Sequence, residues 1–176
     1  MNDIEQQFNI NKQFFNTHKT KDLKFRKHQL KALSKSIKNH EQALLEALKK
    51  DLGKSKVEAY ATEIGILLKS IKLARKELKN WAKTKQVETP LYLFPTKSYI
   101  KNEPYGTVLI IGPFNYPVQL VFEPLIGAIA AGNTAIVKPS ELTPNATEVI
   151  EDIIQDTFEE NYISCHFYHY YCTYEM

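Results

Sequence analysis

Two short runs in the second half of the chain contain the residue types best suited to chemistry. In PFNYP, Asn115 lies between Pro113 and Pro117. A carboxamide held rigidly there can donate a hydrogen bond to an oxygen that becomes negative during a reaction. In KPSE, Lys138 and Glu141 combine a cation with an anion, a pair suited to a ribose and its phosphate. Together the two runs indicate a site that holds a substrate beside a nucleotide cofactor.

Each run also has a purely structural interpretation. Asn115 alone could serve only to tie the turn between its two prolines. Lys138 and Glu141 alone could form an ordinary surface salt bridge, which contributes little. The functional interpretation therefore depends on finding both runs at the same place in the fold.

The pattern around the two runs predicts strand, helix, strand and helix in succession. Thr107–Ile111 and Thr134–Val137 are short β-branched runs, apolar throughout, as expected for parallel strands covered on both faces. Between them, Val118–Ala131 is apolar nearly all round and is ended by Gly132. A further helix should begin at Thr143 as N-cap, with proline at its first position. Ligands bind beyond the carboxyl ends of such strands, where both runs lie.

The first 85 residues predict helices. Leucines and isoleucines recur there at helical spacing with lysines between them, and Gly53 is a natural helix breaker. Residues 86–97 read as a connector, because Pro90 and Pro95 remove hydrogen-bond donors, and Tyr99–Glu103 as a short strand. The predicted helices cover Ile4–Phe15, Leu23–Ile37, His40–Leu52 and Val57–Lys83.

The predicted fold class is therefore α/β, with N-terminal α-helices followed by the first, incomplete part of a doubly wound, Rossmann-like parallel sheet. We divide the chain into a helical region with its connector at 1–97, a partial dinucleotide-binding domain at 98–164, and an atypical tail at 165–176. At 176 residues the chain is long enough to bury a core of its own.

Charge separates the two halves of the chain. Residues 1–85 hold 20 Lys and Arg against 9 Asp and Glu, a net +11, and the remainder carries −8, which together give the chain's +3. The alternative function is thus a basic helical interaction module that binds an acidic partner or nucleic acid. Because 21 of the 23 cations are Lys, whereas Arg is the usual base reader, we favour a solvated face and no nucleic-acid partner.

No membrane or secretory segment is expected. The N-terminus opens with acidic residues and lacks a basic stretch followed by an apolar run. The longest uncharged stretch, Tyr105–Phe122, contains Gly112 and two prolines, which do not suit a lipid-exposed helix. The sequence predicts a cytoplasmic protein.

Taken together, PFNYP and KPSE resemble the NAD(P)-dependent aldehyde dehydrogenases. The intervening EPLIGAIAAGNTAIV fits the same family, and DLGKSKVEAYATEIG at Asp51–Gly65 resembles the shorter class that contains the fatty and aromatic aldehyde enzymes. The resemblance runs from about Ile4 to Ser164, and two separated motifs in register make it specific. It implies oxidation of an aldehyde to a carboxylate, NAD as cofactor with NADP also possible, and a homodimer for the intact protein.

The resemblance also implies individual roles. Asn115 would stabilise the oxyanion of a thiohemiacetal and its tetrahedral successor. Glu141 should favour an unphosphorylated ribose, because its charge repels a 2′-phosphate. The wall beside the nicotinamide would be Ile111, Gly112, Pro113 and Phe114, and the contacts with the adenosine ribose would be Lys138, Ser140 and Glu141.

The family's nucleophilic Cys and its base Glu lie well beyond KPSE. We therefore expect this chain to be a shortened N-terminal portion that is inactive alone. Its last residues, CHFYHYYCTYEM, break sharply with the preceding composition, and we interpret them as the product of a shifted reading frame. Cys165, His166, His169 and Cys172 are possible metal ligands, but we predict no metal site because adjacent Cys165 and His166 would point apart.

Overall fold

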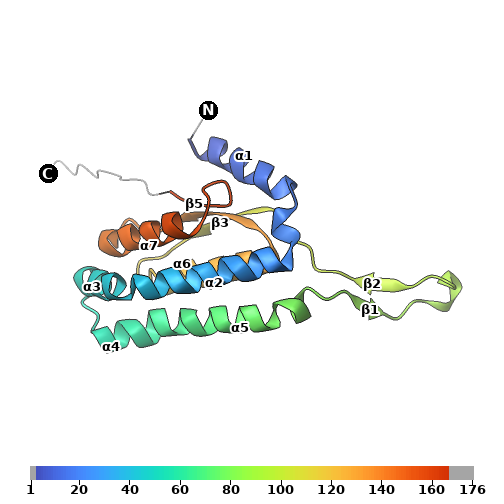
Figure 1. The fold of residues 1–176 in the computed structure, drawn as a ribbon, viewed down its shortest axis with the longest axis horizontal. Coiled ribbons are helices and arrows are strands. Elements are labelled where there is room, and N and C mark those ends of the chain that lie inside the picture. The colour runs from blue at the N-terminus through green and yellow to red at the C-terminus, as the bar shows by residue number, and fades with distance from the viewer. Residues whose placement is uncertain (1–2, 167–176) are drawn as a thin grey trace.

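The computed structural model describes residues 3–166, with helices in the first half and a parallel sheet in the second (Figure 1). The α-helices are α1 (Asp3–Asn16), α2 (Leu23–Asn39), α3 (Glu41–Leu52), α4 (Lys56–Ala59), α5 (Gly65–Trp81), α6 (Gln119–Ala131) and α7 (Pro144–Thr157). Short segments of other helix types are η1 (Lys19–Lys21), η2 (Tyr60–Ile64) and η3 (Leu91–Leu93). The strands are β1 (Lys85–Val87), β2 (Ser98–Ile100), β3 (Thr107–Ile111), β4 (Thr134–Lys138) and β5 (Ile163–Cys165).

The parallel sheet has the strand order β3–β4–β5, and its register pairs Ile111 with Lys138. The α/β fold class and both predicted strands are confirmed. The sequence analysis did not predict β5, because this strand is only three residues long and ends where the composition of the chain changes. The paired ends of β3 and β4 carry the two motif-bearing loops, so these loops emerge side by side.

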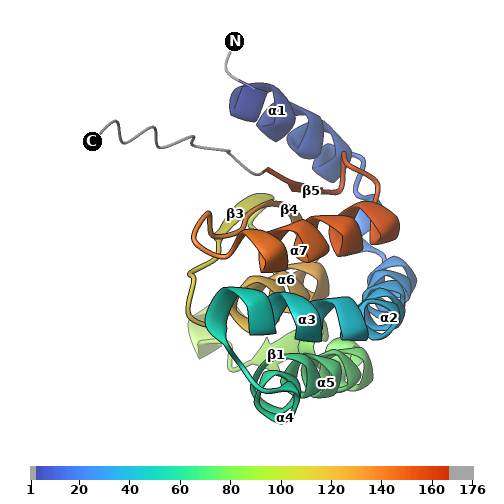
Figure 2. The same cartoon turned by 90° about the vertical axis from the view of Figure 1, so that its left-hand side faces the viewer.

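The elements form layers around the sheet (Figure 2). Helix α1 packs on β4 and β3 on one side of it, and α6 and α7 pack on the other. A further layer of α2, α3 and α5 packs on α6 and α7. One continuous cluster of buried apolar side chains, from Leu30 in α2 to Ile163 in β5, joins the helical layer to the sheet.

The expectation that both parallel strands are covered on both faces is correct for β4 but wrong for β3. In β4 the residues from Thr134 to Val137 are all buried. In β3 the outward side chains of Leu109 and Ile111 are 61% and 65% exposed. Side chains alternate across a strand, and within residues 3–166 no element covers the outward face at this end of β3.

The predicted long helix over Val57–Lys83 is interrupted by a π-helical segment, η2. The segment inserts one residue per turn relative to an α-helix, so the apolar stripe shifts there. Leu67 and Leu78 are buried, as expected for leucines at helical spacing, but Tyr60 and Trp81 of the same predicted helix are exposed. The helical period was right, and its continuity was wrong.

The segment read as a connector contains half of a hairpin instead. Strand β1 pairs antiparallel with β2, with Gln86 opposite Tyr99, and the hairpin projects from the body of the protein (Figure 1). Pro90 and Pro95 flank η3 between the two strands, where no ladder donor is required. The prolines marked the turn correctly, and the strand before them was missed.

The predicted helix ends are placed correctly, with one difference in how an end is capped. Gly53 and Gly132 both adopt the left-handed conformation that ends α3 and α6. Thr143 occupies the N-cap position of α7 as predicted, but its side chain makes no capping bond. The carboxylate of Asp51 accepts from the Ala146 amide at 2.7 Å in its place.

No helix within residues 3–166 is both long and apolar enough to cross a membrane. The interpretation of 165–176 as a frame-shifted tail, and the positions of His169 and Cys172, concern mainly residues outside those that the structure describes. Cys165 and His166 are described, and the His166 amide donates to the Val137 carbonyl at 2.8 Å, extending the ladder between β4 and β5.

Candidate functional site

The two motif-bearing loops meet at the carboxyl edge of the sheet. The amide of Gly112 donates to the carbonyl of Lys138 at 2.8 Å, which continues the ladder of β3 and β4 by one bond. The structure thus brings the PFNYP turn beside the start of KPSE, and the condition set for a functional reading of both runs is met.

Gly112 is required by the close approach of α6 to the turn. A Cβ atom at this position would lie 2.3 Å from Cγ2 of Val121, a distance that no real side chain tolerates. Val121 is itself fully buried in α6. The glycine therefore lets the helix begin directly beneath the loop and holds the loop close to the core.

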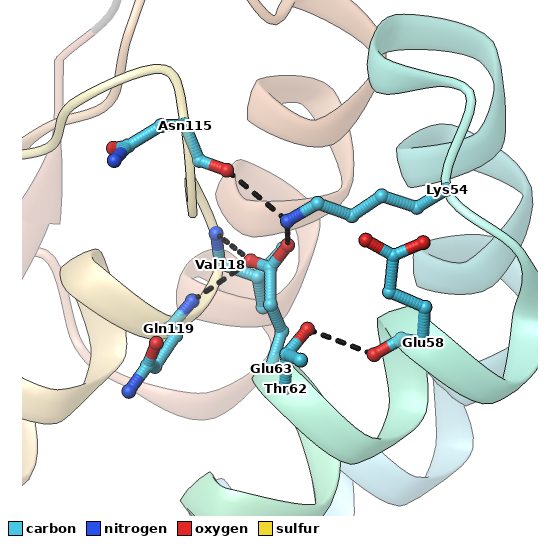
Figure 3. A network of polar contacts seen from close by, with 7 residues as sticks. All are labelled: Lys54, Glu58, Thr62, Glu63, Asn115, Val118 and Gln119. Carbon is cyan, nitrogen blue, oxygen red and sulfur yellow. Dashed lines mark hydrogen bonds and ion pairs between the residues drawn. The ribbon is translucent and has the colours of Figure 1, made fainter.

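Asn115 lies on the exposed turn between β3 and α6, together with Pro113 and Phe114. Its main-chain carbonyl accepts from Nζ of Lys54 at 3.1 Å, whereas its carboxamide points away from Lys54 (Figure 3). Within residues 3–166 the carboxamide makes no hydrogen bond. The backbone of Asn115 is held while its side-chain donor stays free for a ligand.

Glu63 holds the other end of the same turn. Its carboxylate is fully buried, and Oε2 accepts from the amides of Val118 and Gln119 at 2.9 and 3.2 Å. These are amides at the start of α6, where a helix leaves donors without intrahelical partners and where negative charge is favoured. A side chain from η2 thus caps the helix that follows the Asn115 turn.

Lys54 completes the network in Figure 3. Its Nζ lies 2.6 Å from Oε1 of Glu63 and 3.9 Å from the centre of the Tyr116 ring. The ammonium group is buried and is compensated by the carboxylate, the Asn115 carbonyl and the aromatic face.

Sequence reasoning missed both members of this pair. In this segment the sequence marked only Gly53, as a helix breaker, and Gly53 does end α3. One signal could have found Glu63. It precedes Leu67 and Ile71 at four-residue intervals, so it is a charged residue on the apolar stripe of its helix.

The second loop contains an ion pair and a buried serine. Lys138 donates to Glu141, and this hydrogen bond lowers the pKa of the Glu141 carboxyl. Glu141 remains half exposed, so it can also accept from a ligand. Ser140 faces inward instead: its Oγ accepts from the Leu142 amide at 3.2 Å, and its carbonyl accepts from the Thr147 hydroxyl at 2.8 Å.

Cys165 in β5 has the environment of an inert thiol. Burial, and secondly the charge of Glu151, raise its pKa to about 12. A nucleophilic cysteine needs a lowered pKa, because the thiolate is the reactive form. The environment of Cys165 therefore does not suit a nucleophile.

Parallel strands, motif-bearing loops at their carboxyl edge and a helix starting beneath one of those loops define part of a doubly wound α/β fold. The chain belongs to the aldehyde dehydrogenase family, whose family model matches residues 1–164. It is 76% identical over 163 residues to the 4,4′-diaponeurosporen-aldehyde dehydrogenase of Staphylococcus aureus, covering 93% of this chain and 36% of that protein. It is 44% identical over 140 residues to the dimeric NADP-preferring aldehyde dehydrogenase of Canis lupus familiaris, covering 80% and 31%.

Solved structures agree. The substrate-bound AldH of Staphylococcus aureus shares 73% identity and superposes with a TM-score of 0.93, over 96% of this chain and 37% of that one. The Staphylococcus aureus betaine aldehyde dehydrogenase in complex with NAD+ shares 25% identity with a TM-score of 0.80, over 94% and 33%. The chain thus spans about a third of the length of the relatives it matches. The comparisons give no support to the alternative of a basic interaction module.

Proposed function

We propose that this segment supplies the oxyanion donor and the ribose contacts of an NAD(P)-dependent aldehyde dehydrogenase that oxidises an aldehyde to a carboxylate. The observation that carries the proposal is the Gly112–Lys138 hydrogen bond, which fixes the Asn115 turn beside the Lys138–Glu141 pair. Because the chain spans about a third of its relatives, we assign the complete reaction to a longer protein.

Within that reaction the role of Asn115 is electrostatic. Attack on an aldehyde carbon places negative charge on the carbonyl oxygen, and a donor fixed in advance stabilises that charge without reorganisation. Asn115 has its backbone held by Lys54 and its carboxamide free. We assign no nucleophile to residues 3–166, since Cys165 there is kept in its thiol form.

The second loop suits the ribose of a dinucleotide. Glu141 can accept from two hydroxyl groups, and Lys138 holds it in place. The close approach of the backbone at Gly112 leaves room for the wall we assign to the nicotinamide, formed with Ile111, Pro113 and Phe114. When bound, the nicotinamide supplies the acceptor for hydride. Ser140 supports this loop from within instead of facing a ligand.

We propose NAD as the cofactor, with NADP also accepted. The Glu141 carboxylate repels a 2′-phosphate, which favours NAD. Lys138 neutralises part of that charge, so the discrimination should be modest. Glu141→Gln should therefore lower the KM for NADP relative to the KM for NAD.

Three further expectations remain proposals: a division of the chain at residues 97 and 98, a homodimer for the intact protein, and a cytoplasmic location. The first concerns sequence organisation alone, because α2 and α5 of the helical region share one core with α6 and α7.

The test joins residues 1–164 to the remaining two thirds of the Staphylococcus aureus relative and measures aldehyde-dependent NADH formation. The fusion should be active, the 176-residue chain alone inactive, and Asn115→Ala should lower kcat of the fusion by about 10²–10³-fold. An Asn115→Ala fusion that is folded and as active as its parent would overturn the proposal.

A further inference from the structure

A buried ion pair beside the Asn115 turn needs an explanation. Lys54 and Glu63 are both withdrawn from water. Such pairs are weak sources of stability, because the cost of desolvating two charges offsets most of their attraction. Apolar side chains of similar volume could fill the same space. The network in Figure 3 therefore calls for a role other than filling the core.

We propose that the Lys54–Glu63 ion pair is a positioning device that fixes the Asn115 turn, and with it the direction of the Asn115 carboxamide toward the substrate oxygen. The inference rests on the proposed function, because it gives a second pair of residues a part in the oxyanion role of Asn115. Neither residue is assigned a contact with the substrate or the cofactor.

The pair holds the turn at two points. Lys54 donates to the carbonyl of Asn115, in the middle of the turn, at 3.1 Å. Glu63 accepts from the amides of Val118 and Gln119, at its end, at 2.9 and 3.2 Å. The 2.6 Å contact between the Lys54 and Glu63 side chains links these two points of the turn.

These contacts restrict rotation of the peptide that follows Asn115. Its carbonyl is fixed by Lys54, and the next ring, that of Tyr116, lies against the same ammonium group at 3.9 Å. The Cα atom of Asn115 lies in the same peptide plane as this carbonyl, so holding the carbonyl restricts the backbone at Asn115 and thus the position of its Cβ atom. The side chain of Asn115 is exposed and within residues 3–166 has no partner of its own, so its direction depends on its backbone.

The helix that bears Glu63 is distorted at Glu63 itself. Tyr60–Ile64 forms a π-helical segment, a rare distortion that occurs frequently at functional sites. The next residue is Gly65, where a Cβ atom would lie 3.1 Å from the Tyr60 carbonyl. The wider turn brings the Glu63 carboxylate to the start of α6. We infer that the irregular helix serves to place this carboxylate.

A positioning role has a specific kinetic signature. Asn115 acts on charge that develops only in the transition state, so loosening its turn should lower kcat and leave substrate KM nearly unchanged. It should also have no further effect once the carboxamide has been removed, because residues that act as one unit are strongly non-additive.

The experiment uses the complete enzyme formed by joining residues 1–164 to the remaining part of the Staphylococcus aureus relative. Lys54→Met keeps the length of the side chain and removes its donor, and Glu63→Gln keeps the shape and removes the charge. We expect each to lower kcat by about ten- to a hundredfold, with the KM values for aldehyde and NAD changed less than about threefold. The matched controls Lys56→Met and Glu58→Gln alter exposed residues of the adjoining α4 and should leave kcat unchanged.

The decisive readout is each substitution in an Asn115→Ala background. There we expect Lys54→Met and Glu63→Gln to lower kcat no further. If they reduce kcat by the same factor with and without Asn115, the pair acts on general stability and the inference is wrong. If Asn115→Ala itself has no effect on kcat, the proposed function fails instead, and the two failures are distinguishable. Lys54→Met keeps the test available if Glu63→Gln does not fold.

Discussion

The carboxylate of Asp51, at the end of α3, accepts a hydrogen bond from the backbone amide of Ala146, in the first turn of α7, at 2.7 Å. Its second oxygen accepts from the side-chain amide of Asn145, also at 2.7 Å. One side chain therefore caps a helix that begins more than ninety residues later in the chain. The KPSE loop leads directly into that helix, so the cap also fixes the far end of the loop that bears Glu141.

Replacing this cap should destabilise the protein. Asp51→Ala removes the acceptor of the Ala146 amide, and loss of an N-cap lowers the free energy of unfolding by about 1–2 kcal/mol. Asp51→Asn, which keeps one acceptor oxygen, should retain a large part of it. Urea denaturation followed by circular dichroism measures both. Asp152→Ala, on the exposed side of α7, is the control and should have no destabilising effect.

Gly112, which precedes α6, and Gly127, which lies within it, should respond oppositely to alanine. Gly112→Ala forces a Cβ atom toward Val121, and overpacking of this kind lowers the free energy of unfolding by about 1–3 kcal/mol. Gly127→Ala adds a Cβ atom within α6 where nothing lies within 4 Å, and alanine should stabilise the helix by about 0.5–1 kcal/mol. Thermal unfolding of the two variants would refute this packing if their melting temperatures shifted in the same direction.

The thiol of Cys165 should be unreactive in the folded protein. Its pKa of about 12, raised by burial, leaves very little thiolate at neutral pH. In a Cys172→Ser chain, alkylation by iodoacetamide at about pH 8 should be about a hundredfold slower in buffer than in concentrated urea. Mass spectrometry of the modified peptide gives both rates, and equal rates would show that Cys165 is accessible.

The buried hydroxyl of Tyr162 should lower the stability of the protein in alkaline solution. Burial raises the pKa of its hydroxyl above the ordinary value of 10.0, so the folded state keeps a proton that the unfolded state releases above that pH. The unfolded state then binds fewer protons, and the free energy of unfolding falls as pH rises, whereas below the ordinary value this contribution is fully present.

Tyr162→Phe should flatten that decline between about pH 10 and pH 11. It also removes a buried hydroxyl that has no hydrogen-bond partner in the described part of the chain, so stability near neutral pH should not fall. Urea unfolding over this pH range measures both effects. Cys165→Ala in parallel corrects for the second buried acid, and an unchanged slope for Tyr162→Phe would contradict the assignment.

Elements set by local pattern could be predicted from the sequence. Thr107–Ile111 and the buried helix ended by Gly132 follow from compact apolar runs bounded by glycine and proline, and the structure has them at the predicted positions. The sequence also marks Asn115, between Pro113 and Pro117, as a candidate residue, and its role stays a proposal.

Features that depend on partners far along the chain could not be predicted in the same way. Lys54 contacts Asn115 across 61 residues, and Glu63 caps Val118 across 55. Helical spacing marks Glu63 as a charged residue on an apolar stripe, but no pattern in the sequence links it to Val118 or links Lys54 to Asn115. The π-helical segment that contains Glu63 also changes the period on which helix prediction depends. Strand β2 overlaps the strand predicted at Tyr99–Glu103, whereas β1 was missed because three residues are too few for alternation to show.

The backbone hydrogen bond between Gly112 and Lys138 couples the positions of the two loops. A substitution that widens the turn around Asn115 to admit a bulkier aldehyde would also displace Lys138, and with it Glu141. Under the proposed function, a substitution that changes which aldehydes bind would also change which dinucleotides bind. Variants selected for one should carry measurable changes in the other.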